Sequence, residues 1–270
     1  MKTVRRAVWL AAVFAAGACA QDAQAQQPLW EAGLGVGGLR VPHYRGSDQS
    51  HDWAVPVPYF VYRGEIFKSD KDGTRAVVMD TGKVDLDVSF SASPPTRSKD
   101  NVARQGMADL GPTFEIGPNL NVRMARGGGW RADLRIPVRA VVGLGSGGGV
   151  VGFASTPVLN IDVEASGWNV GLQGGPVFAS RGLNARFYEV GSGEATATRP
   201  AYEARGGFAG WGATVSASRK LDGWWIAGYM RADRLNGAVF ADSPLVRQRQ
   251  NLSVGPAASW IFKTSEARAR

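Results

Sequence analysis

The stretch that decides the fold runs from Arg131 to Val142 and reads R-A-D-L-R-I-P-V-R-A-V-V. Successive side chains of a β-strand point to opposite faces, so its charged residues share one face and its apolar residues share the other. Such a strand fits between lipid on one side and a water-filled lumen on the other. We therefore expect Leu134 to face lipid and Arg135 to face the lumen.

The same alternation recurs from Lys83 to Ser91, where Val84, Leu86 and the next two alternate positions are apolar and the positions between them are charged or polar. Two strands of this kind predict an all-β protein, a transmembrane antiparallel β-barrel. The charges expected to face its lumen are Lys83, Asp85, Asp87, Arg131, Asp133, Arg135 and Arg139.

The composition agrees with a barrel that spans a membrane. The chain is 44% hydrophobic, yet no segment after the N-terminus is apolar and long enough for a helical span. A spanning structure must then be a closed barrel, because open sheet edges do not occur in lipid. The 36 glycines, 9 tryptophans, 6 tyrosines and 11 phenylalanines are typical of such strands. We expect outer-membrane lipid to surround the barrel.

The N-terminus is typical of a secretory signal peptide. Lys2, Arg5 and Arg6 precede an apolar run from Ala7 to Ala18, which is followed by small residues. The sequence predicts a signal peptide over residues 1–25, cleaved after Ala25, and an outer-membrane barrel over residues 26–270.

Two alternatives concern the same segment. Cleavage after Ala20 fits the small residues there, and Cys19, the single cysteine, could accept a lipid. The lipoprotein alternative is disfavoured because Ala16 stands where a large aliphatic residue is usual. After cleavage at Ala25 the chain has no cysteine, which excludes disulfides and thiolate catalysis.

Strands and turns can be placed along the whole chain from alternation and turn residues. Thirteen candidate strands cover 30–39, 54–62, 64–69, 74–79, 83–92, 110–117, 120–126, 131–142, 150–163, 168–180, 207–218, 224–235 and 250–262. Barrels of this kind usually have an even number of strands, so we predict about twelve. The error is expected at 64–69 and 74–79, or as a missed strand near Asn184 to Val190. The longer connections are 40–53, 93–109, 181–206 and 236–249.

Motifs that could carry chemistry are weak. The glycine-rich run from Gly143 to Gly148 has dinucleotide-binding spacing, but a strand follows it where that motif needs a helix. His43 and His51 are the only histidines, and the common serine-nucleophile motifs are missing. We expect no enzymatic activity, no cofactor and no metal. The net charge of +8 suits acidic lipid headgroups or a lumen that disfavours cations, and an exported chain is not expected to bind nucleic acid.

Five pieces of sequence resemble the MipA/OmpV family of outer-membrane proteins, which is named for interaction with the lytic transglycosylase MltA. They are Pro42–Asp48, Pro56–Tyr59, Gly106–Gly111, Pro200–Gly207 and Asp242–Val246. The resemblance implies a non-enzymatic scaffold of murein synthesis that brings a lytic transglycosylase together with a bifunctional penicillin-binding protein. The residues alone leave two alternatives open, a passive pore for small solutes and a lipid- or sugar-cleaving barrel enzyme.

The chain continues past Phe262, the last aromatic residue, into a short basic tail over residues 263–270. Outer-membrane barrels typically end on an aromatic residue of the last strand. The tail could offer a surface to a periplasmic partner, or it could be a solvated, disordered end.

Overall fold

The computed structural model describes residues 27–269 except 65–66, 71–72 and 145–147. The predicted signal peptide over residues 1–25 lies outside this range, as does most of the glycine-rich run between Gly143 and Gly148. Within the described part, no helix is long and apolar enough to cross a membrane.

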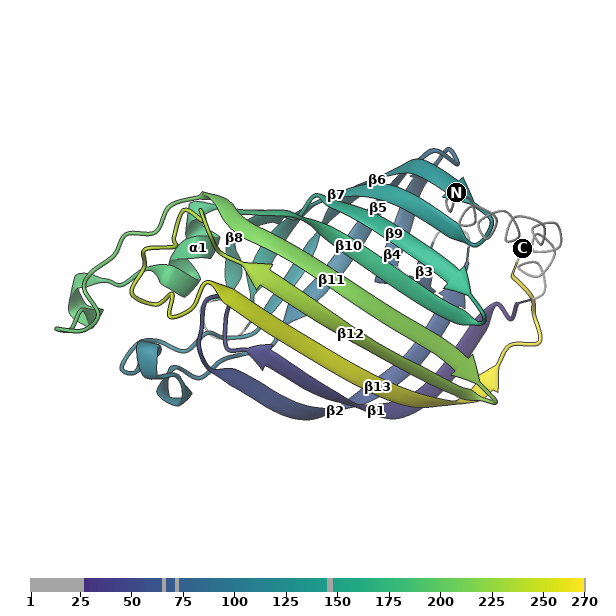
Figure 1. The fold of residues 1–270 in the computed structure, drawn as a ribbon, viewed down its shortest axis with the longest axis horizontal. Coiled ribbons are helices and arrows are strands. Elements are labelled where there is room, and N and C mark those ends of the chain that lie inside the picture. Colours follow the sequence, from purple (N-terminus) through teal and green to yellow (C-terminus); the bar gives the residue numbers. More distant parts are fainter. Residues whose placement is uncertain (1–26, 65–66, 71–72, 145–147, 270) are drawn as a thin grey trace, which may run out of the picture.

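One antiparallel sheet contains all thirteen strands (Figure 1). They are β1 (Trp30–Pro42), β2 (Ser50–Arg63), β3 (Phe67–Asp70), β4 (Gly73–Asp80), β5 (Val84–Ser93), β6 (Thr113–Gly127), β7 (Trp130–Gly143), β8 (Gly149–Ser155), β9 (Val158–Ala165), β10 (Trp168–Ala179), β11 (Gly207–Leu221), β12 (Trp224–Arg234) and β13 (Gln250–Thr264). The described part also contains helix α1 (Arg181–Tyr188) and the 3-10 turns η2 (Ser98–Asp100), η3 (Val102–Arg104) and η4 (Ser192–Glu194).

The sheet closes into a barrel with twelve strand positions. β13 pairs with β1, and β10 pairs with β11, so the described strands leave no end of the sheet unpaired. β8 and β9 occupy one position, because both pair antiparallel with β7, β8 near its end and β9 near its start. The break between them falls at Thr156 and Pro157. The prediction of a transmembrane barrel with about twelve strands is confirmed, and its single strand over 150–163 is divided in two.

The error in the predicted number of strands does not lie at 64–69, at 74–79 or near Asn184 to Val190, where it was expected. β3 and β4 are genuine strands, and residues 181–188 form helix α1. The error was the split of 110–117 from 120–126, which are one strand, β6. Gly117 and Pro118 read as a turn in the sequence. Pro118 nevertheless pairs with Val88 of β5, while the β6–β7 pairing skips both residues. One partner strand is enough to keep β6 extended through the proline.

The connections differ strongly between the two ends of the barrel. The long ones, 43–49, 94–112, 180–206 and 235–249, lie at the end that carries α1, and residues 27 and 269, the two ends of the described chain, lie at the other end (Figure 1). Tight turns dominate that other end, and Ser166–Gly167 and Asp222–Gly223 have the positive φ of two-residue hairpin turns. Long loops normally face outward and short turns face the periplasm, which orients the barrel.

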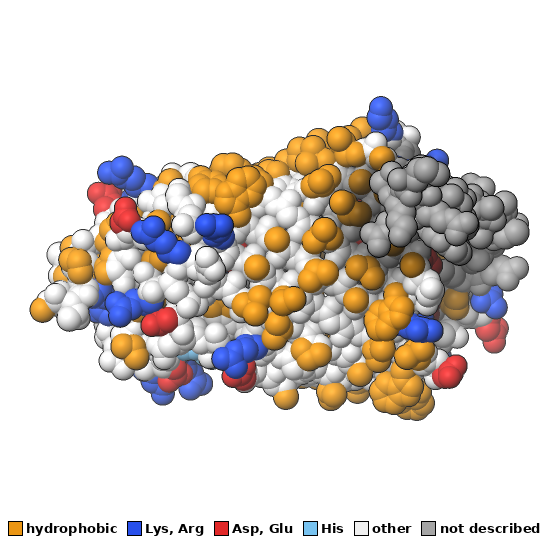
Figure 2. Space-filling view, in the orientation of Figure 1, with side chains coloured by type: hydrophobic (Ala, Val, Ile, Leu, Met, Phe, Trp, Pro, Cys, Tyr) orange, Lys and Arg blue, Asp and Glu red, His pale blue; other side chains and the backbone are white. Residues whose placement is uncertain are grey.

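The outer surface of the barrel is apolar. Hydrophobic side chains are spread over its middle, while charged side chains gather towards the loop end (Figure 2). The outward positions include Leu34, Val36, Leu120, Leu159, Leu172, Val215 and Trp260, all well exposed. Arg135 lines the interior, so Leu134 beside it lies on the outer face.

The C-terminal tail is ordered and paired. Ser265 donates its backbone N–H to Trp30, and Leu29 and Ala269 complete a short ribbon with Ala267 and Gln27 at N to O distances of 2.8 and 2.9 Å. The interpretation of the tail as a disordered end is therefore wrong for residues up to Ala269. The backbone hydrogen bonds of the N-terminal segment hold the tail beside β1.

Candidate functional site: the barrel lumen and its two ends

The long loops pack together into a folded cap at the extracellular end. Its core includes Tyr44, Leu110, Val190 and Leu245, one from each of the four long loops. Phe240 is 0% exposed and stacks on Tyr188 with ring centroids 3.6 Å apart. We call loops 43–49, 94–112, 180–206 and 235–249 the cap. Sequence reasoning treated these segments only as connections.

Buried hydrogen bonds fasten the loops of the cap to one another. Tyr44 donates its hydroxyl to the Leu245 carbonyl at 2.8 Å, and Tyr188 donates to the Arg45 carbonyl at 2.8 Å. The Asn101 amide donates to Ser47 Oγ at 3.0 Å and to His43 Nδ1 at 3.1 Å. These bonds join parts of the chain that are far apart in sequence.

Two arginines support the cap by binding backbone carbonyls. Arg104 donates to the carbonyls of Phe187 and Ala108, both at 3.1 Å. Arg199 donates from Nη1 to the carbonyls of Ala103 and Gln105, both at 2.9 Å. Loop 94–112 is thus tied to loop 180–206 from both sides.

The buried environment of the cap shifts several titration equilibria. Burial raises the pKa of Tyr44 to about 12, and it raises the pKa of the fully enclosed Tyr188 further. Burial also lowers the pKa of Arg104. The pKa of His43 lies below its ordinary value because of burial first and the neighbouring His51 second. The two imidazoles stack with centroids 3.9 Å apart.

His43 and His51 contact amide and aromatic groups of the cap and of β2. His43 Nδ1 receives the Asn101 amide, and His51 stacks between His43 and Trp53. Among the described residues, no group of three or more His, Cys, Asp or Glu side chains could hold a metal ion.

Four of the five family-like pieces lie in or beside the cap. Pro42–Asp48, Gly106–Gly111 and Asp242–Val246 supply Tyr44, Leu110 and Leu245 to its core, and Pro200–Gly207 supplies Tyr202, which packs against that core. Most of the sequence that resembles the family therefore lies in the residues that pack together at the extracellular end.

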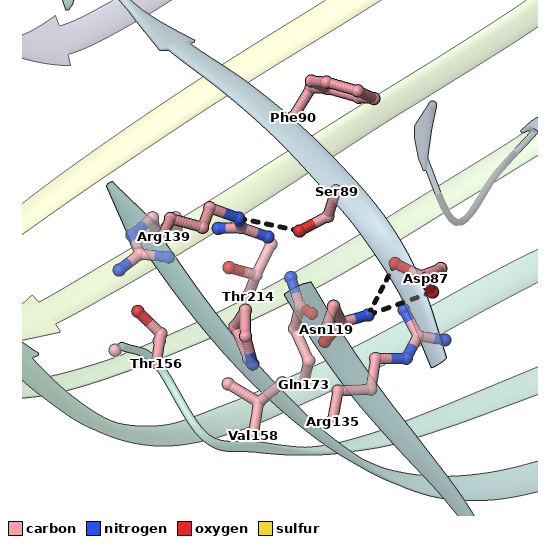
Figure 3. A pocket seen from close by; sticks show the side chains of 13 residues that line it. Asp87, Ser89, Phe90, Asn119, Arg135, Arg139, Thr156, Val158, Gln173 and Thr214 are labelled. Atoms are coloured by element: carbon pink, nitrogen blue, oxygen red, sulfur yellow. Dashed lines mark hydrogen bonds between the residues drawn. The ribbon is translucent and has the colours of Figure 1, made fainter. Parts of the chain in front are cut away.

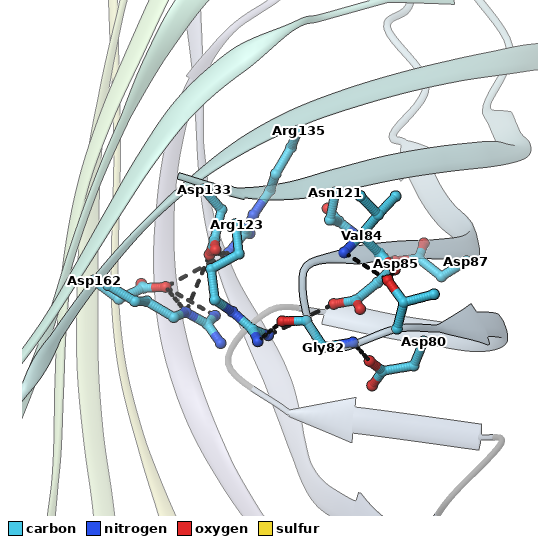
Figure 4. Close-up of polar contacts among 12 residues, drawn as sticks. Asp80, Gly82, Val84, Asp85, Asp87, Asn121, Arg123, Asp133, Arg135 and Asp162 are labelled. Atoms are coloured by element: carbon cyan, nitrogen blue, oxygen red, sulfur yellow. Dashed lines mark hydrogen bonds and ion pairs between the residues drawn. The ribbon is translucent and has the colours of Figure 1, made fainter. Parts of the chain in front are cut away.

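Inside the barrel, ion pairs link β5, β6, β7 and β9 (Figure 4). Arg131 contacts Asp162 at 2.9 Å and Asp133 at 3.2 Å, and Arg135 lies 3.5 Å from Asp162. Nearer the periplasmic end, Arg123 lies 3.8 Å from Asp85.

Further up the lumen, Asp87 and Arg139 are held by neutral polar groups (Figure 3). Asp87 is only 2% exposed and accepts hydrogen bonds from the amides of Asn119 and Asn121. Arg139 donates from Nε to Ser89 Oγ at 3.0 Å and lies 3.8 Å from Glu115.

Six of the seven expected lumen charges line the two cavities described below: Asp85, Asp87, Arg131, Asp133, Arg135 and Arg139. Lys83 differs, because it is exposed in the turn before β5. The alternation includes Lys83, but the strand begins one residue later.

The sequence interpretation missed several inward-facing residues. Asp162 and Asn160 alternate with apolar residues in β9, a signal that alternation alone could have found. Arg231 donates to Asp233 at 2.8 and 2.9 Å, and Arg45 of the cap reaches the same carboxylate at 3.0 Å. That last contact joins the cap to the lumen wall, and nothing local in the sequence indicates it.

A charged cluster lies at the periplasmic end. Glu31, which is buried, pairs with Arg63 at 2.7 Å and with Lys220 at 2.5 Å, and it accepts the Tyr59 hydroxyl at 3.1 Å. Lys220 comes from β11 and reaches past two strand positions to β1. The Tyr59 ring also packs on Trp225, with centroids 5.4 Å apart. We call this cluster the periplasmic latch.

Two cavities lie between the cap and the periplasmic end. The upper cavity has a volume of about 280 Å³, and the lower one has about 70 Å³. Asp87, Asn119 and Arg135 line both, so they form the partition between the two. Tyr229 points inward over Gly255 and is still 37% exposed, so the lumen is not filled by side chains at its level.

An apolar outer surface, a charged lumen and a closed antiparallel sheet define the class: this is an outer-membrane β-barrel protein. The model of the family "MltA-interacting protein MipA" matches residues 34–262, and the chain belongs to that family.

The solved structures to which the chain is similar include two channels and a phospholipase. The COG4313 outer membrane channel from Pseudomonas putida F1 has a TM-score of 0.45 and 11% identity, covering 89% of this chain and 98% of that one. The CymD monoaromatic hydrocarbon channel has a TM-score of 0.40 and 9% identity, covering 87% and 89%. Outer membrane phospholipase A from Escherichia coli has a TM-score of 0.32 and 9% identity, covering 87% of this chain and 94% of that one. No curated protein sequence matches the chain.

Proposed function

We propose that this protein is an outer-membrane scaffold that holds a lytic transglycosylase, and with it a bifunctional penicillin-binding protein, at the periplasmic face. Membership of the family named for interaction with MltA carries this proposal. In this role the protein performs no catalysis.

The partner surface in this proposal is the ribbon formed by residues 27–29 and 265–269. It is paired, it lies at the end where the turns are short, and it carries exposed Arg268 beside Glu266, with exposed Lys263 of β13 next to it. Charges at the rim of an interface chiefly accelerate association and make it sensitive to salt. An acidic partner surface would fit it.

The test is capture of transglycosylase and penicillin-binding protein from cross-linked envelopes. A chain that ends after Thr264 keeps β13 complete and removes the tail, and we expect it to capture less partner, most visibly at low salt. Lys99→Gln in the cap is the matched control and should capture as much as the wild type. If the truncated chain captures as much partner as the wild type, the ribbon is not the partner surface. If the full chain captures no partner, the proposed scaffold role is wrong.

A passive pore for small solutes is the second candidate, favoured by the upper cavity and by the exposed ring of Tyr229. A conducting lumen would give steady current in planar bilayers, with an ion preference that changes when Arg131, Arg135 and Arg139 are neutralised. A barrel closed by the cap and the latch would conduct poorly before and after. Robust, charge-dependent conductance without partner capture would favour the pore.

A further inference from the structure

We propose that the upper cavity is a binding site for a compact oxyanion, a solute bearing phosphate or carboxylate oxygens. The site lies inside the barrel between the cap and the partition, and its walls come from β5 through β12. It is distinct from the periplasmic surface to which the scaffold role is assigned.

The charge of the cavity lining is unbalanced. Three guanidinium groups line it, from Arg135, Arg139 and Arg231, against the single carboxylate of Asp87. That carboxylate already accepts three amide contacts, at 2.7 to 3.3 Å, from Asn119 and Asn121. The lining therefore presents positive charge, which attracts an anion.

The carboxylates that pair with these arginines lie outside the cavity lining. Asp233 binds Arg231 through Nε and Nη2, and Glu115 lies 3.8 Å from Arg139. Each guanidinium has five N–H donors. In the part of the chain that the structure describes, Nη1 of Arg231 and Nη2 of Arg139 have no hydrogen-bond partner, so both arginines retain donors for an anion.

Neutral polar groups complete the lining. Gln173, Thr156 and Thr214 face the cavity, and among the described residues their side chains make no hydrogen bond. Thr156 lies at the break between β8 and β9, next to Pro157. A side chain at Gly175 would collide with the Pro157 carbonyl, so glycine there lets the broken strand pass close over β10. The break thus forms part of the cavity wall.

The dimensions favour a small solute. Pockets for drug-sized ligands span roughly 300 to 1,000 Å³, and the upper cavity of about 280 Å³ falls at the bottom of that range. The lower cavity continues from the partition towards the charged residues Asp85 and Arg123 near the periplasmic turns. The anion would reach the site from the periplasm through that cavity, because the cap covers the other end.

The experiment is isothermal titration of the purified full chain in detergent with sodium phosphate and, separately, with sodium acetate, at constant ionic strength. We expect saturable binding of at least one of the two, and the comparison identifies the preferred oxyanion. Arg139→Gln and Arg231→Gln should each weaken it by about tenfold to a hundredfold, as expected for loss of a charge-assisted hydrogen bond. Arg234→Gln, which removes the same charge from the exposed end of β12, is the matched control and should bind like the wild type.

Arg231→Gln also removes a partner of Asp233, so a second variant leaves every ion pair intact. Gln173→Glu places a negative charge in the lining at nearly constant size, and we expect it to abolish binding while the barrel remains heat-modifiable. The proposal is overturned if the assembled wild type binds neither anion. It is equally overturned if assembled Gln173→Glu binds as well as the wild type.

Discussion

The two ends of the barrel are held together by different physical means. At the extracellular end, Phe240, Leu235 and Leu245 are fully buried in the core of the cap. At the periplasmic end, Glu31 pairs with two cations, one of which, Lys220, is 47% exposed. Apolar packing is insensitive to salt, whereas a partly exposed ion pair is screened by it. The contacts of the cap should therefore persist at high salt, whereas those of the latch should weaken.

Loops at the surface of a barrel are usually its most mobile segments. Here the loops have a hydrophobic core and a network of buried hydrogen bonds of their own, and none of the described turns of the other end contributes to that core. Stability should consequently be distributed unequally, with the cap able to open without loss of the barrel. The following predictions test this separation, from the largest expected effect to the smallest.

Phe240→Ala should have the largest effect, and only at one end. Removing a fully buried phenylalanine costs about 3–5 kcal/mol, and here it also removes the stacking on Tyr188. We expect loops 180–206 and 235–249 to become sensitive to protease in intact cells. The barrel should still run as a folded, heat-modifiable species on gels. Failure of the barrel itself to assemble would mean that the two ends are not independent.

Glu31→Gln should weaken the periplasmic latch alone. The variant keeps the size of the side chain but loses the charge that faces Arg63 and Lys220, at a cost of about 1–3 kcal/mol. Thermal unfolding in detergent should begin at a lower temperature, and the difference from the wild type should shrink in 1 M salt. Protease resistance of the cap should be unchanged. A difference that persists at high salt would show that packing, not charge, dominates the latch.

Tyr44→Phe should have a smaller effect on the cap than Phe240→Ala. It removes only the hydroxyl that binds the Leu245 carbonyl, which is worth about 1 kcal/mol. We expect a slight rise in the rate of proteolysis of loop 235–249. A loss of protease resistance as great as that of Phe240→Ala would show that hydrogen bonds, rather than the apolar core, stabilise the cap.

Acidification should loosen the cap slightly. The pKa of His43 in the folded cap lies below its ordinary value of 6.5, so the folded state favours the neutral ring. This contribution is fully present above pH 6.5 and is lost as the pH falls through the lowered pKa. The protection of loop 43–49 against hydrogen exchange, corrected for the intrinsic pH dependence of exchange, should therefore fall below pH 6.5, and His43→Gln should remove that fall. His51, Asp48 and Asp100 also shift the pKa of His43. A pH dependence that remains in His43→Gln would therefore be assigned to these three groups.

The barrel could be predicted from sequence because alternation records which face of a strand meets lipid. Arg131 to Val142 and Lys83 to Ser91 carry that pattern with few exceptions, and six of the seven charges chosen from it line the cavities. The predicted number of strands was wrong at one place, because Gly117 and Pro118 indicate a turn in the sequence. In the structure both residues lie inside β6.

The cap could not be predicted in the same way. Its core joins Tyr44 to Leu245, two residues that are 201 positions apart, and such packing leaves no periodic trace in either segment. The latch has the same character, since Glu31 and Lys220 are 189 positions apart. Contacts of this kind follow from barrel closure, which brings distant strands side by side.

The ribbon between residues 27–29 and 265–269 has a consequence for the topology of the chain. With β8 and β9 counted as one strand position, every seam of the barrel except that between β1 and β13 joins positions that are neighbours in sequence. The ribbon places the two ends of the described chain at that last seam. Joining Gln27 to Ala269 by a short linker would turn the barrel into a continuous ring. New chain ends could then be introduced at the exposed turn around Gly82 without moving a strand. The same barrel could therefore form from a chain whose strands follow one another in a different order.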